Sequence, residues 1–199
     1  LERTLAQLRL SGARDTLQTR LEQATASQMN AQELLALLLQ DELDRRQSRL
    51  IDKRYKDSRL DEKVTLAEID WSFNPKVPRG ACFELHTLKF VSEGANALLI
   101  GKPGTGKSHV AKAVAYHAVQ QGLKVTYVEA DSDFARYARV DVREREQMLQ
   151  RLLAADLVVL DDLFLAKRVS EAAAELLQTL VHQRHRRRRR RRHRDRAVL

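Results

Sequence analysis

Eight consecutive residues, Gly101-Lys-Pro-Gly-Thr-Gly-Lys-Ser108, carry the strongest chemical signal in the sequence. They fit the pattern G-x-x-x-x-G-K-[ST], a glycine-rich loop whose backbone N–H groups cradle phosphate oxygens. In this pattern the ammonium group of Lys107 reaches the β and γ phosphates, and the hydroxyl group of Ser108 can bind Mg²⁺. The loop therefore predicts a site for nucleotide phosphates.

The surroundings of the loop suit this chemistry. A short apolar run, Asn96–Ile100, predicts a buried strand before it, and a helix is predicted from about Ser108 to Gln121. The start of that helix adds the positive end of its dipole to the anion site. We therefore predict phosphate binding rather than an ordinary glycine-rich turn. The predicted nucleotide-contacting residues are Gly101, Lys102, Pro103, Gly104, Thr105, Gly106, Lys107, Ser108 and His109.

A second motif consists of two carboxylates that follow the apolar run Leu157–Leu160. Ligands bind at the carboxyl ends of strands in open α/β sheets, and Asp161 and Asp162 follow such an end. Alone the motif fits a simple turn, but its place 54 residues after Lys107 favours a functional role. We predict Asp161 and Ser108 as Mg²⁺ ligands, and Asp162, which would orient or deprotonate water, as catalytic together with Lys107.

The chain of 199 residues has a net charge of +9 that is confined to its end. From Arg184 to Leu199 there are ten Arg and one Asp, so the first 183 residues hold 26 basic and 26 acidic groups. The net charge therefore describes a tail and gives no argument for a DNA-binding body.

Composition excludes several classes of protein. With 43% hydrophobic residues, 7 Gly and 3 Pro, the chain is neither collagen-like nor a Pro/Gly-rich disordered protein. Its apolar runs are far shorter than the ~20 residues that span a bilayer, so no membrane partner is expected. Cys82 is the only cysteine, which excludes an internal disulfide and favours a cytoplasmic location.

Residues 1–69 predict a small, all-helical N-terminal domain with leucines at helical spacing. Asn30 followed by Glu33 matches a capping box, and the helix that it starts is expected to reach about Ser58. The second half of this helix carries a basic stripe that includes Arg45-Arg46. We interpret the stripe as a solvated face, and a contact surface for DNA or a partner is the alternative.

From about residue 70 the pattern changes to strands that alternate with helices, which predicts an α/β fold with a parallel sheet. An extended linker comes first. The predicted strands are Asn96–Ile100, Val125–Val128 and Leu157–Leu160, and the predicted helices are about Cys82–Ser92, Ser108–Gln121, Asp141–Ala155 and Ser170 to about His182.

The loop and the paired aspartates together resemble the AAA+ ATPases, which are P-loop proteins. Longer strings resemble the IstB family more closely, the helper ATPases of insertion-sequence transposition, which are similar to DnaC-type helicase loaders. These strings are Ala95–Ala115 around the loop, Leu8-Arg-Leu-Ser-Gly12, Trp71-Ser-Phe73 and Leu160-Asp-Asp-Leu-Phe164. The resemblance covers about residues 1–184.

The resemblance implies a P-loop NTPase fold of AAA+ type that binds ATP and Mg²⁺. Many other AAA+ proteins have Asp-Glu where this chain has Asp161-Asp162, so water positioning by the shorter Asp162 could be looser. Family members form nucleotide-dependent homo-oligomers on DNA and present that DNA to a transposase. Trp71 and Phe73 are expected either near the adenine or in the packing of the linker.

After Arg184 the sequence departs from the family. The family continues with an apolar strand and a polar sensor residue, whereas this chain has His185 and seven consecutive Arg, Arg186–Arg192. We therefore expect a C-terminally incomplete sheet in a chain truncated or frameshifted after about residue 184. ATP hydrolysis would be impaired, because the sensor and the arginine finger have no counterpart. The alternative is a purposeful Arg-rich tail that binds nucleic acid without sequence preference.

The expected organisation has three parts: a helical domain at 1–69, a partial AAA+ ATP-binding domain at 70–183 and a disordered Arg-rich tail at 184–199. The leading hypothesis is an ATP-binding helper of DNA transposition, and whether it is an active ATPase stays open. A DnaC-type loader acting on a replicative helicase is one alternative, and a non-enzymatic nucleic-acid-binding fragment is another. Binding that does not depend on nucleotide would favour the last of these.

Overall fold

The computed structural model describes the backbone of residues 1–163 and 171–196, and the side chains of these residues up to 186. The chain divides into two compact units, Leu1–Lys53 and Arg54–Leu199, whereas the sequence places a boundary after residue 69. Residues 54–69 belong to the second unit because they pack within it. Val64 and Leu66, for example, form a buried cluster with Ala113.

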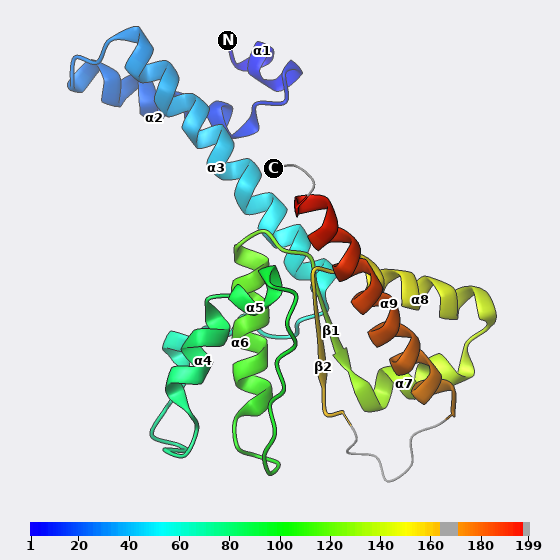
Figure 1. Cartoon of the computed structure of the whole chain (residues 1–199). Helices are drawn as coiled ribbons and strands as arrows, with labels where there is room; N and C mark the ends of the chain where they lie inside the picture. The colour runs from blue at the N-terminus through cyan, green and yellow to red at the C-terminus, as the bar shows by residue number, and fades with distance from the viewer. Residues whose placement is uncertain (164–170, 197–199) are drawn as a thin grey trace. The chain divides into compact units, whose positions relative to one another are not determined.

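The first unit is built from α1 (Glu2–Gln7), α2 (Ser11–Ala26) and α3 (Ala31–Ser58), which continues past the unit's end (Figure 1). The capping box predicted at the start of α3 is present. The Oδ1 atom of Asn30 accepts the N–H of Glu33 at 2.9 Å, and the Oε2 atom of Glu33 accepts the N–H of Asn30 at 2.8 Å. The small core of this unit consists of Leu5, Leu10, Ala13, Leu17, Leu34 and Leu38.

Gly12 lets α2 and α3 approach closely. Its N–H donates to Oε2 of Glu42 at 2.5 Å, and a Cβ atom here would lie 2.7 Å from the main-chain oxygen of Asp41 and 2.7 Å from the Cα atom of Glu42. Arg20 donates to both carboxylate oxygens of Asp41, at 2.8 and 2.7 Å, and these bonds lower the pKa of Asp41 to about 2. The close approach of α2 and α3 thus explains why glycine stands at the end of the string Leu8-Arg-Leu-Ser-Gly12.

Two arginines of the basic stripe of α3 pair with carboxylates of the same unit. Arg45 pairs with Asp15 at 2.5 Å, and Arg46 pairs with Glu42 at 2.6 Å. These two arginines therefore take part in ion pairs within the first unit, and the interpretation of the whole stripe as a solvated face stays a prediction.

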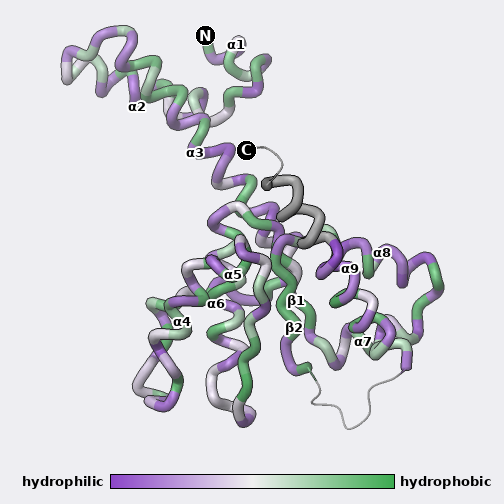
Figure 2. Tube along the Cα trace, in the orientation of Figure 1, coloured by the Kyte–Doolittle hydropathy of each residue, from purple (hydrophilic) through white to green (hydrophobic). Residues whose placement is uncertain are grey.

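The second unit contains two parallel strands, β1 (Val125–Glu129) and β2 (Leu157–Asp161), paired so that Glu129 lies opposite Asp161. Within the described residues the sheet consists of these two strands. Both were predicted from their apolar runs, and Figure 2 shows the apolar colour along them. The expected α/β class with a parallel sheet is confirmed, although most of the chain is helical.

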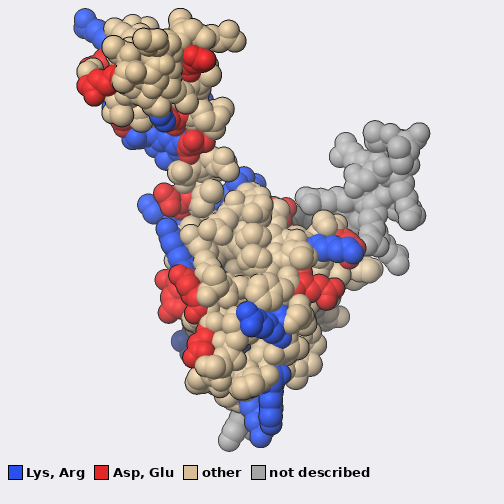
Figure 3. Space-filling model, turned by 90° about the vertical axis from the view of Figure 1, so that its left-hand side faces the viewer, with Lys and Arg blue, Asp and Glu red and all other residues tan. Residues whose placement is uncertain are grey.

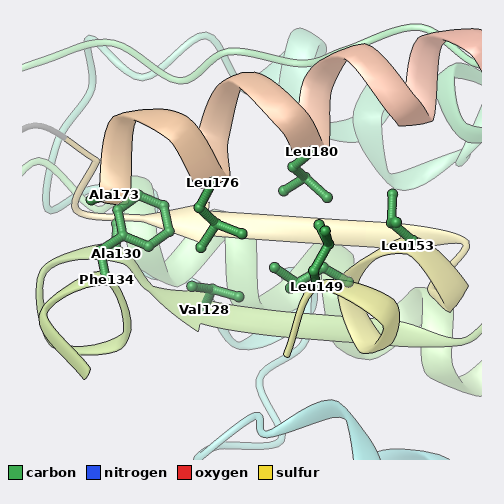
Figure 4. Packing of buried hydrophobic residues seen from close by; sticks show 9 residues of the cluster. Val128, Ala130, Phe134, Leu149, Leu153, Ala173, Leu176 and Leu180 are labelled. Carbon is green, nitrogen blue, oxygen red and sulfur yellow. The ribbon is translucent and has the colours of Figure 1, made fainter. Parts of the chain in front are cut away.

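Helices cover both faces of this pair of strands (Figure 1). On one face lies α6 (Lys107–Gln120), and on the other lie α7 (Ala130–Arg139), α8 (Val142–Ala154) and α9 (Glu171–Arg196). The core under the last three is apolar (Figure 4), and its buried members are Val128, Ala130, Phe134, Leu149, Leu152, Leu153, Ala173, Leu176 and Leu180. Successive strand residues point to opposite faces, so Val128 faces this core and Tyr127 faces α6.

The segment before the loop forms η1 (Leu66–Glu68), α4 (Arg79–His86) and α5 (Lys89–Ser92). The sequence predicts a single helix over Cys82–Ser92. Leu88 divides it because its φ of 58° lies in the left-handed region, which a continuous helix cannot contain. Within residues 1–163 and 171–196, none of the helices combines the length and the apolar character that crossing a membrane requires.

The prediction of a buried strand at Asn96–Ile100 is wrong. This segment has no regular secondary structure, and the side chains of Leu98 and Ile100 are 79% and 84% exposed. A strand exists only as a member of a hydrogen-bonded ladder, and in the described part of the chain β1 and β2 pair with each other alone. An apolar run therefore does not become a buried strand here.

Helix α9 continues to Arg196, where the sequence predicts a disordered tail from residue 184. Arg is a favourable helix former, so a run of Arg extends a helix that has already started. Arg184 is folded in, because its guanidinium group donates to the carbonyl oxygens of Leu152, Ala155 and Asp156 at 3.0, 2.7 and 2.9 Å. Ser170, the predicted start of the last helix, lies outside the described residues. Phe164, the last residue of the string Leu160-Asp-Asp-Leu-Phe164, also lies outside them.

Candidate nucleotide-binding site

The loop of residues 101–108 leads into α6 with two glycines in the left-handed region. Gly104 has a φ of 74°, and Gly106, the N-cap of α6, has a φ of 88°. A Cβ atom at either position would meet no atom within 4 Å, so the backbone conformation rather than lack of space requires glycine. The loop thus ends at the first turn of a helix, where unpaired N–H groups and the dipole favour an anion.

The side chains of the loop converge on one main-chain oxygen. The Nζ atom of Lys107 and the Oγ1 atom of Thr105 each donate to the carbonyl oxygen of Lys102, both at 2.8 Å. The amide of Asn74, from the linker, donates to the carbonyl oxygen of Thr105 at 3.4 Å. Lys107 therefore lies across its own loop, held by a neutral oxygen that a phosphate can replace with a stronger, charge-assisted bond.

The two predicted metal ligands are in contact. The hydroxyl group of Ser108, at the start of α6, donates to Oδ1 of Asp161, at the end of β2, at 3.0 Å. The same oxygen accepts the N–H of Asp162 at 3.0 Å, while Oδ2 accepts the hydroxyl group of Tyr127. Asp162 itself is exposed and has a φ of 52°, a conformation that Asp adopts more readily than most residues.

The residues at this position suit Mg²⁺. Ser108 and Asp161 present a hydroxyl and a carboxylate oxygen, the hard donors that Mg²⁺ prefers, and this ion usually keeps several water and phosphate ligands. Among the residues that the structure describes, no group of three or more His, Cys, Asp or Glu side chains is placed to hold a metal ion. The hydroxyl and carboxylate oxygens of Ser108 and Asp161 would fit a Mg²⁺ ion whose other ligands are water and phosphate oxygens.

A pocket of about 680 Å³ lies beside the loop, a volume typical of small-molecule sites. Linker residues, among them Ile69, Trp71, Phe73 and Val77, supply apolar and aromatic lining, and the glycine-rich loop supplies much of the rest. Such a lining fits a ligand that combines a flat ring system with phosphates. The lining residues are Ile69, Asp70, Trp71, Phe73, Asn74, Val77, Pro103, Gly104, Thr105, Gly106, Lys107, Ser108, His109, Val110 and Asp162.

The two linker aromatics differ in their surroundings. Trp71 stacks on Phe83 with ring centroids 5.8 Å apart, and the guanidinium carbon of Arg79 lies 5.2 Å from the Trp71 ring centroid. Phe73 is 73% exposed within the pocket wall. Both rings line the pocket. Trp71 also packs against Phe83, so Phe73 is the more exposed of the two rings and the more available to a ligand.

Tyr127, whose hydroxyl group contacts Asp161, lies near charged side chains. Burial raises the pKa of Tyr127 well above its ordinary value, and the hydrogen bond to Asp161 raises it further. The Nζ atom of Lys112 lies 5.8 Å from the Tyr127 ring centroid and donates to Asp61 at 2.7 Å. Burial lowers the pKa of Lys112, but the hydrogen bond to Asp61 and the negative charges of Asp61, Glu62 and Asp161 together outweigh burial, so the net change is upward. Both groups therefore remain protonated donors near neutral pH.

The structure brings most of the predicted residues to one place. Pro103 to His109 and Asp162 line the pocket. Asp161 is not part of this lining, but from the end of β2 it contacts Ser108. Gly101 and Lys102 form the start of the loop and are not part of the lining. Sequence reasoning missed Tyr127, Lys112 and Asn74, because their relevance depends on strand register and on linker packing that no local pattern records.

Comparison with known proteins gives a consistent result. An ATP-binding protein of insertion sequence IS21 from Pseudomonas aeruginosa is 34% identical over 164 residues, which cover 82% of this chain and 62% of that relative. An insertion-sequence ATP-binding protein of Mycobacterium tuberculosis is 28% identical over 183 residues, covering 90% of this chain and 72% of the relative. The chain thus spans less than two thirds of the Pseudomonas relative's length.

The family model for IstB-like ATP-binding proteins matches residues 3–192. This range includes the helices of the first unit, the glycine-rich loop and the strand that ends at Asp161. On that match, the chain belongs to the family of IstB-like ATP-binding proteins.

Proposed function

We propose that this chain binds ATP with Mg²⁺ and acts as an ATP-binding helper of insertion-sequence transposition. The observation that carries the proposal is the 3.0 Å hydrogen bond between Ser108 and Asp161. It joins the start of the loop helix to the end of β2, beside a pocket of about 680 Å³. A hydroxyl and a carboxylate in contact at this place are the ligands that nucleotide-bound Mg²⁺ needs.

Each residue has a proposed task. The N–H groups of the loop and the ammonium group of Lys107 bind the phosphates, and Phe73 stacks on the base. Ser108 and Asp161 hold Mg²⁺, which when bound neutralises phosphate charge. Asp162 would orient the attacking water molecule in any ATP hydrolysis, which we expect to be impaired, and its exposed position leaves its carboxylate accessible.

The proposed partners are DNA, a transposase and further copies of this chain. The names of the relatives connect them to insertion sequences, which supports transposition over helicase loading. On the face seen in Figure 3, basic and acidic side chains are interspersed. Because the net charge of +9 is confined to residues 184–199, DNA contact is proposed for the Arg-rich end of the chain, with no sequence preference. A cytoplasmic location follows from the proposed ligands, ATP and DNA.

Nucleotide binding is tested by titrating a fluorescent ATP analogue into the wild-type chain and into Lys107→Ala, with Mg²⁺ or with EDTA. We expect Mg²⁺-dependent binding by the wild type and a loss of at least ~10-fold in affinity for Lys107→Ala, because the charge that meets the phosphates is removed. Lys124→Ala is the matched control, since it deletes an exposed lysine that is absent from the pocket lining.

Equal affinity of the wild type and Lys107→Ala would contradict the proposal. Equal losses for Lys107→Ala and Lys124→Ala would also contradict it, because they would reflect net charge rather than a phosphate contact.

A further inference from the structure

Tyr127 occupies a place in β1 from which it reaches the proposed metal ligand. It lies opposite Val159 in the strand register, and Asp161 follows two residues later in β2. Since every second residue of a strand points to the same face, Tyr127 and Asp161 share the face covered by α6. The side chain of Tyr127 is 5% exposed, and its hydroxyl group donates to Oδ2 of Asp161.

The two oxygens of Asp161 have separate partners. Oδ2 accepts the hydroxyl group of Tyr127, whereas Oδ1 accepts the hydroxyl group of Ser108 and the N–H of Asp162, both at 3.0 Å. A carboxylate held at both ends cannot rotate without breaking a bond. The donor at Oδ2 therefore helps to fix the orientation that presents Oδ1 to the start of α6, together with the donors at Oδ1.

The donor is itself held in place. Its ring lies below the ammonium group of Lys112, 5.8 Å from the ring centroid, and Lys112 is bound to Asp61 at 2.7 Å. A phenol with an ordinary pKa of ~10 is protonated at neutral pH and donates. Tyr127 thus combines burial, a ring held beside Lys112 and a hydroxyl group that donates to Asp161.

We propose that Tyr127 is a positioning residue for Mg²⁺ binding, which orients Asp161 so that Oδ1 faces Ser108. The inference rests on the proposed function, because it assigns a second task at the same site. Partners that orient a metal ligand typically change metal affinity by ~10–100-fold when they are removed. Nucleotide phosphates contact the loop rather than Tyr127, so affinity for metal-free nucleotide does not depend on this hydroxyl group.

The test replaces the hydroxyl group alone, with Tyr127→Phe. A fluorescent ATP analogue is titrated at a series of Mg²⁺ concentrations and in EDTA. We expect the Mg²⁺ concentration that gives half of the metal-dependent gain in affinity to rise ~10-fold or more. Affinity in EDTA should stay within ~2-fold of the wild type. Tyr137→Phe is the matched control, because Tyr137 packs against the core on the opposite face of the strands.

Each outcome decides the matter. An unchanged half-saturating Mg²⁺ concentration in Tyr127→Phe overturns the inference while ATP binding by the wild type stands. An equal loss of affinity in EDTA and in Mg²⁺ also overturns it, since that pattern indicates a purely structural role. A wild-type chain that binds no nucleotide overturns both the inference and the proposed function.

A second measurement tests the inference even if Tyr127→Phe does not fold. The chain with 3-fluorotyrosine at position 127 keeps the hydroxyl group and reports on it by ¹⁹F NMR. In the presence of ATP, addition of Mg²⁺ should move the ¹⁹F signal, because the acceptor carboxylate gains a cation. A signal that does not move when Mg²⁺ raises ATP affinity overturns the inference.

Discussion

The imidazole rings of His86 in α4 and His117 in α6 are stacked, with centroids 3.8 Å apart and 17° between their planes. Burial lowers the pKa of His117, and the neighbouring His86 lowers it further. Two protonated rings at this distance would repel each other. The contact that joins α4 to α6 therefore requires at least one neutral ring.

Acid should therefore weaken the second unit through His117. Its folded-state pKa lies below the unfolded value of ~6.5, so the unfolded chain binds the proton more readily, and stability is lost as pH falls below ~6.5. Thermal unfolding at pH 7.5 and pH 5.5 measures this. His117→Phe keeps a flat ring without a titrating group, and its melting temperature should drop less over this range. If His117→Phe and an exposed-site control, His185→Gln, show the same drop as the wild type, the stacked pair is not responsible.

Gly12→Ala should destabilise the first unit. The added Cβ atom would lie 2.7 Å from main-chain atoms of Asp41 and Glu42, so α2 and α3 must separate. Overpacking of this kind costs about 1–3 kcal/mol in the free energy of unfolding. Urea denaturation followed by circular dichroism measures the change.

The control for that substitution is Gly80→Ala, near the start of α4. A Cβ atom at Gly80 meets nothing within 4 Å, so the alanine should leave stability unchanged or raise it by up to ~1 kcal/mol. Equal stability of Gly12→Ala and the wild type would show that the two helices adjust without cost.

Phe73→Ala should weaken binding of ATP more than binding of tripolyphosphate. Phe73 is the exposed aromatic ring of the pocket wall, and stacking on a base is worth ~1–3 kcal/mol, or about 5–150-fold in affinity. Tripolyphosphate has no base, so its competition against the fluorescent analogue reports the loop alone. Equal losses for both ligands would place the base elsewhere.

Removal of the Arg-rich end should abolish salt-sensitive DNA binding. The chain should be cut after His185 rather than before Arg184, because Arg184 holds three carbonyl oxygens at the end of α8. The longer chain should lose orders of magnitude in duplex affinity between ~50 and ~200 mM salt. Fluorescence anisotropy with two unrelated duplexes measures affinity and sequence preference. Strong binding by the shortened chain would move the DNA contact to the folded units.

The elements with local signals were predictable from the sequence. β1 and β2 are apolar runs, α6 follows a glycine-rich loop, and the capping box at Asn30 marks the start of α3. α7 was not predicted, because it begins at Ala130 directly after β1 ends, with no glycine or proline between them. Asn96–Ile100 has the same local signal as β2 and a different outcome, since the neighbour that a strand needs is not a local property.

In the candidate site, too, some residues are predictable from local motifs and others are not. The loop residues and Asp161 can be read from motifs, because their chemistry depends on short spacing along the chain. The contact between Tyr127 and Asp161 joins residues that are 34 positions apart. It depends on which strands are neighbours and on their register, and a buried tyrosine in a strand is otherwise an ordinary core residue.

The exposed segment before the loop affects how assembly of this chain must be measured. Asn96-Ala-Leu-Leu-Ile100 contains no charge and no proline, and its leucine and isoleucine side chains face solvent. Segments of this composition associate with one another as protein concentration rises, whether or not nucleotide is present. Light scattering that rises with protein concentration in the absence of ATP would therefore report association through residues 96–100. Only the scattering that appears when ATP is added and disappears when ATP is removed can be attributed to an ordered oligomer.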